Sequence, residues 1–368
     1  MKKVGILTYH NGFNYGACLQ AYALQHVLER YDVDCTIINY EPIDFLASRE
    51  MFSRRPFKLK EIVKVVTRTP YYKSLKNRER LFREYNDNCL KTTKLLRKRE
   101  EVIAETAKYD AVFCGSDQIW NLGKKAGPAA NTIYFMDFPK EQKRIAYAAS
   151  FGSWVKEADS REEDILPWLK QFDKISVREN SGVEYLQSKG IDCIQALDPT
   201  VLLDADEYNS ICAEPIIDGK YILMFGWNVN ADLISVAKAA AKKFNLPVYN
   251  IVPPPRGLMS GIKRELAIGP CEFLSMVKNA SFIVTNSFHG TAFSTTFEKP
   301  FVSVVTGKAD VRMESLLRQL GLSDCLLEKD DIDFDKLMDI DYSDVMEKKR
   351  LLRNDSLNFI EKAVKDII

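Results

Sequence analysis

The chain of 368 residues lacks the features that mark several large classes of protein. None of its apolar runs approaches the roughly 20 residues that a transmembrane helix needs, and the apolar stretch at residues 4–7 is too short for a signal sequence. Its eight cysteines include no C-x-x-C pair, so we expect neither a disulfide framework nor a zinc site. We also expect no other metal and no cofactor. The net charge of +1 gives no general reason to expect binding of nucleic acid. A reducing cytoplasm is the expected compartment.

Histidine is also scarce, with only three residues in the chain. The most informative of them is His289, within the segment A-S-F-I-V-T-N-S-F-H-G-T-A-F-S at residues 280–294. The apolar first part of this segment predicts a buried strand. Asn286 and Ser287 can cap a helix, and a helical pattern resumes near Thr291. His289 is therefore expected in a turn between a strand and a helix.

Such a turn is a favoured place for a ligand. In open parallel sheets ligands bind at the carboxyl ends of strands, and a helix N-terminus there offers unpaired N–H groups to an anion. Gly290 allows close approach of the backbone, and an imidazole in this position can transfer protons. The alternative is a hydrogen-bonded histidine in an ordinary turn. His26 is expected on the apolar face of a helix, as a core residue.

Strand and helix patterns alternate along the whole chain, which is typical of α/β proteins. In the first half the expected strands are 4–9, 34–39, 111–114, 144–149 and 174–177, with helices at 17–30 and 182–189. In the second half the strands are 221–226, 247–252, 282–284 and 300–305, with helices at 231–244 and 270–278. We therefore predict two Rossmann-like domains facing a cleft, in a glycosyltransferase-B-like architecture closed by a C-terminal amphipathic helix. The predicted domains are residues 1–205 and 206–345, and the closing helix is 346–368.

Residues 51–100 form a basic, helical insertion in the first predicted domain. Lysine and arginine greatly outnumber acids there, and aromatic residues are interleaved with them. The basic stretch 54–99 can lie on an anionic membrane or contact a phosphorylated lipid head group. The alternative is an ordinary solvated helical face.

Several short motifs occur in a fixed order along the chain. They are N-Y-G-A-C-L-Q-A-Y-A-L at 14–24, G-S-D-Q-I-W-N at 115–121, S-V-R-E at 176–179, L-D-P-T at 197–200, G-P-C-E-F-L at 269–274 and T-N-S-F-H-G-T-A-F-S at 285–294. The ordered set resembles the polysaccharide pyruvyl transferase family. The resemblance implies a bacterial enzyme that transfers a pyruvyl group from phosphoenolpyruvate to a sugar of a cell-surface polysaccharide, such as an exopolysaccharide or capsule, or of its lipid-linked precursor. The product is a cyclic ketal across two hydroxyls, and the enzyme is expected in the cytoplasm or at the inner face of the plasma membrane.

This chemistry suggests roles for individual residues. The second domain is the expected donor side, because the turn at Ser287 and Gly290 can hold a phosphate. His289 and Asp117 are the expected proton donor and base, and a neighbouring anion raises the pKa of an imidazole. Which of the two is acid and which is base is left open. The remaining donor-binding candidates are Asn286, Arg178, Arg312 and Lys308, and the acceptor-binding candidates are His10, Asn14, Tyr15, Gly16, Gln118 and Asn121.

Two other functions are compatible with the same patterns. One is a nucleotide-sugar-dependent glycosyltransferase of the same architecture, in which the helix N-terminus binds a diphosphate. The other is a non-catalytic relative that binds an anion. Fold alone does not decide among these.

Overall fold

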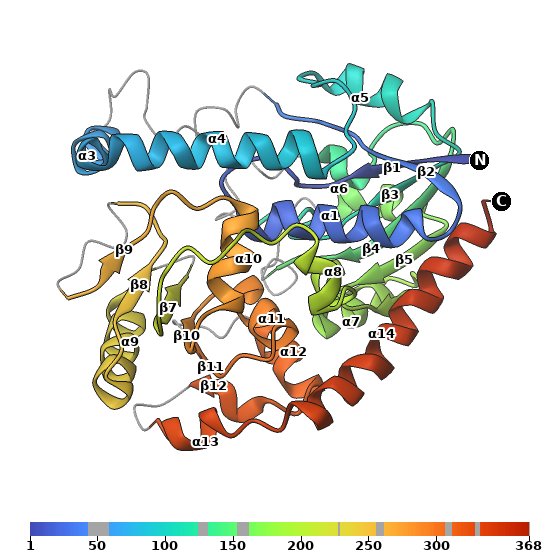
Figure 1. The fold of residues 1–368 in the computed structure, drawn as a ribbon. Coiled ribbons are helices and arrows are strands. Elements are labelled where there is room, and N and C mark those ends of the chain that lie inside the picture. Colours follow the sequence, from blue (N-terminus) through green and yellow to red (C-terminus); the bar gives the residue numbers. More distant parts are fainter. Residues whose placement is uncertain are drawn as a thin grey trace. The chain divides into compact units, whose positions relative to one another are not determined.

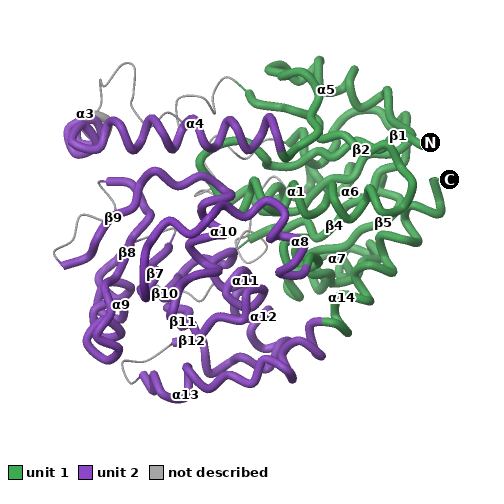
Figure 2. Tube along the Cα trace, viewed as in Figure 1, with its two compact units in different colours: residues 1–49, 89–203, 350–368 green, residues 50–88, 204–349 purple. Residues whose placement is uncertain are grey.

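The computed structural model describes residues 1–42, 59–123, 132–152, 162–226, 229–254, 261–305, 311–327 and 332–367. The chain forms two compact units (Figure 2). Unit 1 comprises Met1–Arg49, Cys89–Leu203 and Arg350–Ile368, and unit 2 comprises Glu50–Asn88 and Asp204–Lys349.

Unit 1 is built on a six-stranded sheet with strand order β2-β1-β3-β4-β5-β6, in which every neighbouring pair is parallel (Figure 1). Val4 pairs with Cys35 on one side and with Ala111 on the other, which places β1 inside the sheet. The strands are β1 (Lys2–Leu7), β2 (Val33–Ile37), β3 (Ala111–Cys114), β4 (Lys143–Ala149), β5 (Lys174–Val177) and β6 (Ile194–Gln195). The helices are α1 (Tyr15–Glu29), α5 (Arg99–Thr106), α6 (Glu162–Leu169), α7 (Asn180–Ser188) and the C-terminal part of α14 (Tyr342–Lys365).

Helix α1 shows how the sequence sets these elements. It begins at Tyr15, because the Asn14 side chain accepts hydrogen bonds from the backbone N–H groups of Gly16 and Ala17. Almost all of α1 is buried, and His26 is half-buried and stacks on Tyr22. The helix is thus part of the core of unit 1.

Unit 2 has a second six-stranded parallel sheet, with strand order β12-β11-β10-β7-β8-β9. Its central strands β10 and β11 are short, mostly apolar and buried at every residue, as expected for strands that are covered on both faces. The strands are β7 (Ile222–Phe225), β8 (Val248–Asn250), β9 (Lys263–Arg264), β10 (Phe282–Thr285), β11 (Phe301–Val304) and β12 (Leu326–Leu327). The helices are α3 (Leu59–Arg68), α4 (Tyr72–Cys89), α8 (Ala205–Asn209), α9 (Ala231–Phe244), α10 (Pro270–Lys278), α11 (Phe288–Thr296), α12 (Val311–Gln319) and α13 (Phe334–Met338), followed by the start of α14.

Two segments group differently from the predicted domain boundaries. Residues 50–88, the larger part of the basic insertion, belong to unit 2. The physical reason lies partly in Arg78, which is buried and donates a hydrogen bond to the carbonyl of Ile251 at 3.1 Å. The end of α14 belongs to unit 1, where the Ser356 hydroxyl accepts a hydrogen bond from the backbone N–H of Leu197.

Candidate active site

The order of the strands reverses once in each sheet. In unit 1 the reversal lies between β1 and β3, and in unit 2 it lies between β7 and β10. Ligands of open α/β sheets bind outside the carboxyl ends of the strands at such switch points. The motifs at 14–24 and 115–121 follow β1 and β3, and the motif at 285–294 begins at the end of β10. Each unit therefore carries motif residues at its own switch point, where a ligand of that sheet is expected to bind.

In unit 2, helix α11 begins immediately after β10. The Ser287 side chain caps it by accepting a hydrogen bond from the N–H of Gly290 at 3.4 Å, and the Ser287 N–H donates to Thr285 Oγ1 at 3.1 Å. The prediction that His289 precedes the helix was wrong, because α11 begins at Phe288 and His289 lies in its first turn. The early start depends on Gly290, where a Cβ atom would lie 2.2 Å from Thr285 Oγ1.

The side chain of Asn286, the residue after β10, lies beside the end of β7. A Cβ atom on Gly226, the residue after β7, would lie 2.1 Å from Asn286 Oδ1. The amide side chain of Asn286 therefore lies directly against the backbone at the end of β7. It needs a glycine there, since any side chain would displace it.

Two of the predicted side chains of unit 2 contact the ring of Phe288. His289 is 7% exposed, and its ring meets the Phe288 ring edge-on at a centroid distance of 5.2 Å. The guanidinium of Arg312, from α12, lies 5.6 Å from the centroid of the same ring. His289 and Arg312 therefore share Phe288 as a neighbour. The predicted Lys308 lies outside the described residues.

In unit 1, Gln20 joins the two sides of the switch point. Its Nε2 donates to Thr8 Oγ1 at 2.9 Å and to the carbonyl of Tyr9 at 2.7 Å, after β1. Its Oε1 accepts from the N–H of Ser116 at 3.0 Å, after β3. Sequence reasoning missed this residue. The available signal was a glutamine in an otherwise apolar stretch of a motif.

Arg178 was expected to face the donor, and the structure shows it paired inside unit 1. Its Nη2 lies 2.6 Å from Asp198 Oδ2, and the two side chains are 2% and 0% exposed. The same nitrogen donates to Ser116 Oγ at 2.6 Å. Residues from the motifs at 14–24, 115–121, 176–179 and 197–200 therefore form one buried hydrogen-bonded cluster. The sequence patterns gave Asp198 no role beyond its place in the motif at 197–200. Direct contact of Arg178 with the donor stays a prediction.

The neighbouring Glu179 has a separate role. Its Oε1 accepts hydrogen bonds from the N–H groups of Phe151 at 2.7 Å and Gly152 at 3.1 Å, so it holds the loop that follows β4. This loop in turn packs on the residues after β3, because a Cβ atom on Gly152 would lie 2.6 Å from Asn121 Nδ2 and 2.8 Å from Gln118 Oε1. Gln118 and Asn121 are also hydrogen-bonded to each other at 2.7 Å.

Asp117 occupies an uncommon backbone conformation. Its φ of 67° lies in the left-handed region, which aspartate tolerates better than most residues. Its Oδ1 accepts a hydrogen bond from the N–H of Gln118 at 2.8 Å, and the side chain does not cap a helix, since no helix follows within residues 115–123. Asp117 is 7% exposed. Residues held in such conformations cluster at functional sites, where surrounding contacts impose them.

The predicted acceptor residues after β1 lie beside the same switch point. His10 is buried, with Nδ1 3.1 Å from the carbonyl of Thr8 and Nε2 3.2 Å from Asn39 Oδ1. Asn14 caps α1 with its side chain, and Tyr15 and Gly16 form the first turn of that helix. These residues follow β1 as predicted, and the contacts of His10 and Asn14 organise the loop after β1. Their contact with an acceptor stays a prediction.

Comparison with known families now identifies the chain. The family model described as polysaccharide pyruvyl transferase matches residues 14–307, which spans all six motifs. The chain belongs to the polysaccharide pyruvyl transferase family. It is therefore a polysaccharide-modifying transferase.

Solved structures show which fold this chain has. A protein described as a UDP-N-acetylglucosamine 2-epimerase from Listeria monocytogenes is similar at a TM-score of 0.53 and 14% identity, over 96% of this chain and 90% of that one. The UDP-GlcNAc 2-epimerase from Methanocaldococcus jannaschii is similar at a TM-score of 0.50 and 12% identity, over 96% of this chain and 93% of that one. The pyruvyl transferase thus has a two-domain, glycosyltransferase-B-type α/β fold. No curated protein matches its sequence.

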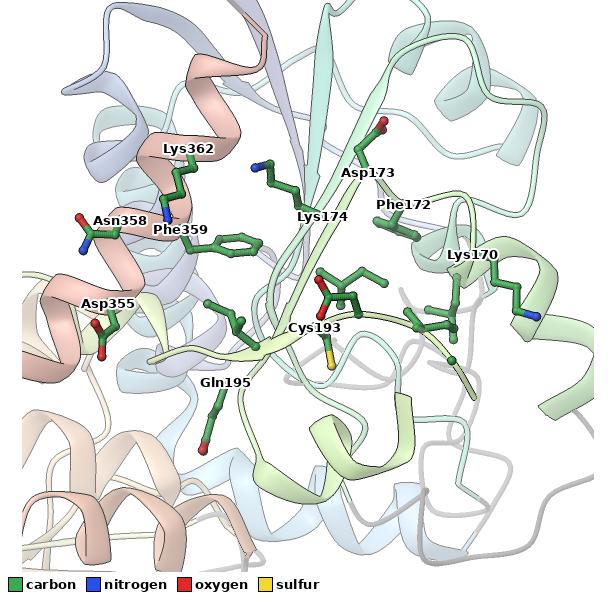
Figure 3. A pocket seen from close by; sticks show the side chains of 16 residues that line it. Lys170, Phe172, Asp173, Lys174, Cys193, Gln195, Asp355, Asn358, Phe359 and Lys362 are labelled. Carbon is green, nitrogen blue, oxygen red and sulfur yellow. The ribbon is translucent and has the colours of Figure 1, made fainter. Parts of the chain in front are cut away.

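A cavity of about 770 Å³ lies elsewhere in unit 1 (Figure 3). It is lined by residues from the segment between α6 and β5, from β5, from the segment leading into β6 and from α14, including Phe172, Lys174 and Phe359. None of the predicted site residues lines it. Size alone therefore does not make this cavity the active site, and the motif residues at the strand ends are the better candidates.

Among the described residues, no group of three or more His, Cys, Asp or Glu side chains is placed to hold a metal ion. None of the helices described is both long enough and apolar enough to cross a membrane.

Proposed function

We propose that this enzyme transfers a pyruvyl group from phosphoenolpyruvate to two hydroxyls of a sugar, forming a cyclic ketal. The sugar belongs to a cell-surface polysaccharide or to its lipid-linked precursor. The observation that carries the proposal is that the motifs of a pyruvyl transferase family flank the switch point of each sheet. Ligands of such sheets bind at these points.

Phosphoenolpyruvate carries a phosphate and a carboxylate, so its site needs several donors of positive charge or hydrogen bonds. The N-terminus of α11 supplies the phosphate side through Ser287 and Gly290, with Asn286 beside them. Arg312 and Lys308 supply positive charge in the same unit. Arg178 contacts the donor or, through its pair with Asp198 and its bond to Ser116, positions the neighbouring Asp117.

The reaction needs one proton at carbon and removal of protons from two hydroxyls. In our proposal protonated His289 donates a proton to the methylene carbon of phosphoenolpyruvate, which leaves an oxocarbenium-like centre at the adjacent carbon. A sugar hydroxyl forms a C–O bond to this centre while Asp117 accepts its proton. The bond between this carbon and the phosphate oxygen then breaks. The second hydroxyl attacks the same carbon and closes the ring, and its proton leaves with the phosphate. The proposal also includes the opposite assignment, in which Asp117 donates the proton to the methylene carbon and His289 accepts the proton of the sugar hydroxyl.

The proposal is tested with purified enzyme, phosphoenolpyruvate and a panel of isolated polysaccharides and lipid-linked oligosaccharides. We expect phosphate release that requires an acceptor, together with a pyruvylated product seen by mass spectrometry. Calorimetry against phosphoenolpyruvate and a panel of nucleotide sugars is the second measurement. Binding of nucleotide sugars alone favours a nucleotide-sugar-dependent glycosyltransferase of the same architecture. Binding of phosphoenolpyruvate without any turnover favours a non-catalytic relative.

A lipid-linked acceptor would bring the enzyme to the inner face of the plasma membrane. The basic stretch 54–99 supports this part of the proposal through its attraction to anionic lipids. Arg54, Arg55 and Lys58 lie outside the described residues. Reversal of their charges is expected to weaken binding to anionic vesicles in a salt-dependent way.

A further inference from the structure

Helix α3 presents its apolar side to solvent. Leu59, Ile62, Val63 and Val66 stand at positions i, i+3, i+4 and i+7, which lie on one face of a helix. Their exposed fractions are 76%, 44%, 42% and 64%. A surface helix of a globular protein normally turns such a face toward its core. The orientation of α3 is the reverse of this arrangement.

The contacts of α3 explain which side faces the protein. Lys64 and Arg68, on the polar side, are half-buried, and Arg68 Nε donates a hydrogen bond to the carbonyl of Pro254 at 2.6 Å. Just beyond the helix, the Arg264 guanidinium lies over the Tyr71 ring and donates to its hydroxyl. Figure 1 shows α3 at one end of α4, in the same unit. The polar side is therefore committed to unit 2, which leaves the apolar side outward.

We propose that the apolar face of α3 inserts into the interfacial region of an anionic phospholipid membrane, with the helix axis in the membrane plane. Helices with one apolar and one basic face bind membranes in this way. Tyr72, 53% exposed, follows the helix, and tyrosine is typical of the membrane interface. The proposal deepens the membrane contact given under Proposed function by placing that contact on α3, and it does not depend on the pyruvyl chemistry.

Charge favours a lipid surface over a second copy of the chain. Residues 51–88, the part of the basic insertion that belongs to unit 2, contain 11 lysines and arginines but only 4 acidic residues. Two copies docked through α3 would bring these cationic segments together, and like charges repel. An anionic lipid surface attracts the same segment, and burial of the apolar face then adds a contribution that salt does not screen.

The test uses the full-length enzyme and flotation with vesicles of phosphatidylglycerol and phosphatidylcholine, or of phosphatidylcholine alone. The variant is Leu59→Gln/Val66→Gln, because glutamine favours a helix at least as well as valine and nearly as well as leucine. We expect its partition onto the anionic vesicles to fall by about 30-fold or more. The matched control Met338→Gln/Leu351→Gln removes two exposed apolar side chains elsewhere and should bind like the wild type.

Three results would overturn the proposal. The first is unchanged vesicle binding by Leu59→Gln/Val66→Gln. The second is a loss of thermal stability in that variant, which would show that the chain itself covers this face. The third is a wild-type enzyme that ignores anionic vesicles and instead self-associates through α3. Vesicle binding is measured without any reaction, and pyruvyl transfer to a water-soluble acceptor should be unchanged in the variant. Failure of this inference is thereby distinguishable from failure of the proposed function.

Discussion

Replacing Asp198 by asparagine tests the buried cluster that joins the motifs of unit 1. Asp198 Oδ2 lies 2.6 Å from Arg178 Nη2, and both side chains are almost fully buried. Asparagine retains an oxygen that can accept from the N–H and hydroxyl of Thr200, now at 2.9 and 2.6 Å from Asp198 Oδ1. What Asp198→Asn removes is therefore the charge that compensates Arg178.

The expected cost follows from this burial. Removing one partner of a buried ion pair lowers the free energy of unfolding by about 3–5 kcal/mol, because the remaining charge is left uncompensated in a medium that solvates it poorly. The amide nitrogen would also meet the guanidinium as a second donor. We expect Asp198→Asn to lower the free energy of unfolding of unit 1 by about 3 kcal/mol or more. Turnover should fall as well. Arg178 donates to the hydroxyl of Ser116, next to Asp117, and it is no longer held in place by the charge of Asp198.

The assay is urea unfolding followed by the fluorescence of Trp120, in a background where the other three tryptophans are phenylalanine. Trp120 reports on unit 1 because it packs against Phe135, Phe151 and Phe172. The matched control is Asp366→Asn, which breaks the ion pair between Asp366 and Lys174. The Asp366 side chain is 57% exposed, so this variant should lower the free energy of unfolding by less than about 1 kcal/mol. The reasoning is refuted if Asp198→Asn costs no more than this control. It is also refuted if Arg178→Met/Asp198→Asn costs the sum of its two single variants, since the pair should couple by about 2 kcal/mol.

Three further predictions concern single residues. His289→Asn should lower turnover by about 10²- to 10⁴-fold with little change in thermal stability, whereas His26→Asn should leave kcat unchanged; full activity of His289→Asn would exclude the proposed proton transfer. Gly290→Ala should destabilise unit 2 by about 1–3 kcal/mol, because the new methyl group meets Thr285 Oγ1, and Thr285→Ala/Gly290→Ala should recover part of the loss in thermal unfolding. Burial opposes ionisation of Asp173, but hydrogen bonds from the Arg144 backbone, Lys140 and Lys143 outweigh it and lower its pKa. Because the folded-state pKa is the lower one, the carboxylate adds stability above its unfolded pKa of about 3.9, and this stability is lost as the pH falls through the folded-state pKa. Asp173→Asn should therefore be less stable than the wild type at neutral pH, with a difference that narrows below about pH 4; a constant difference would contradict this assignment.

Much of the fold could be predicted from local patterns. The strand Ala111–Cys114 and the helices Ala231–Phe244 and Pro270–Lys278 have the predicted bounds, because each combines a clear apolar period with a defined start or end. The edge strands β6, β9 and β12 were not predicted, since two residues each are too few to show a period. Their pairing depends on the neighbouring strand.

The candidate site was predicted less completely, for a different reason. Positions at strand ends can be read locally, so Asn286, Ser287, His289 and Asp117 could be placed at strand ends, and their roles stay predictions. The partners of buried polar groups are not local. Arg178 pairs with Asp198 twenty residues later, and Gln20 bonds to Ser116 in another motif. No pattern within one element shows such a partner, so the internal pairing of Arg178 emerged only from the structure.

The path of the chain also limits how the protein can be divided. Unit 1 is assembled from three separate segments, and the last begins at Arg350, after all of unit 2. Ile360, Ala363 and Val364 of that segment are buried. During synthesis, the apolar surface of unit 1 that they cover remains open until the ribosome has made both units. Expression of residues 1–203 alone should therefore yield an aggregation-prone fragment, and a circular permutant that carries residues 350–367 ahead of residue 1 should allow this unit to close earlier.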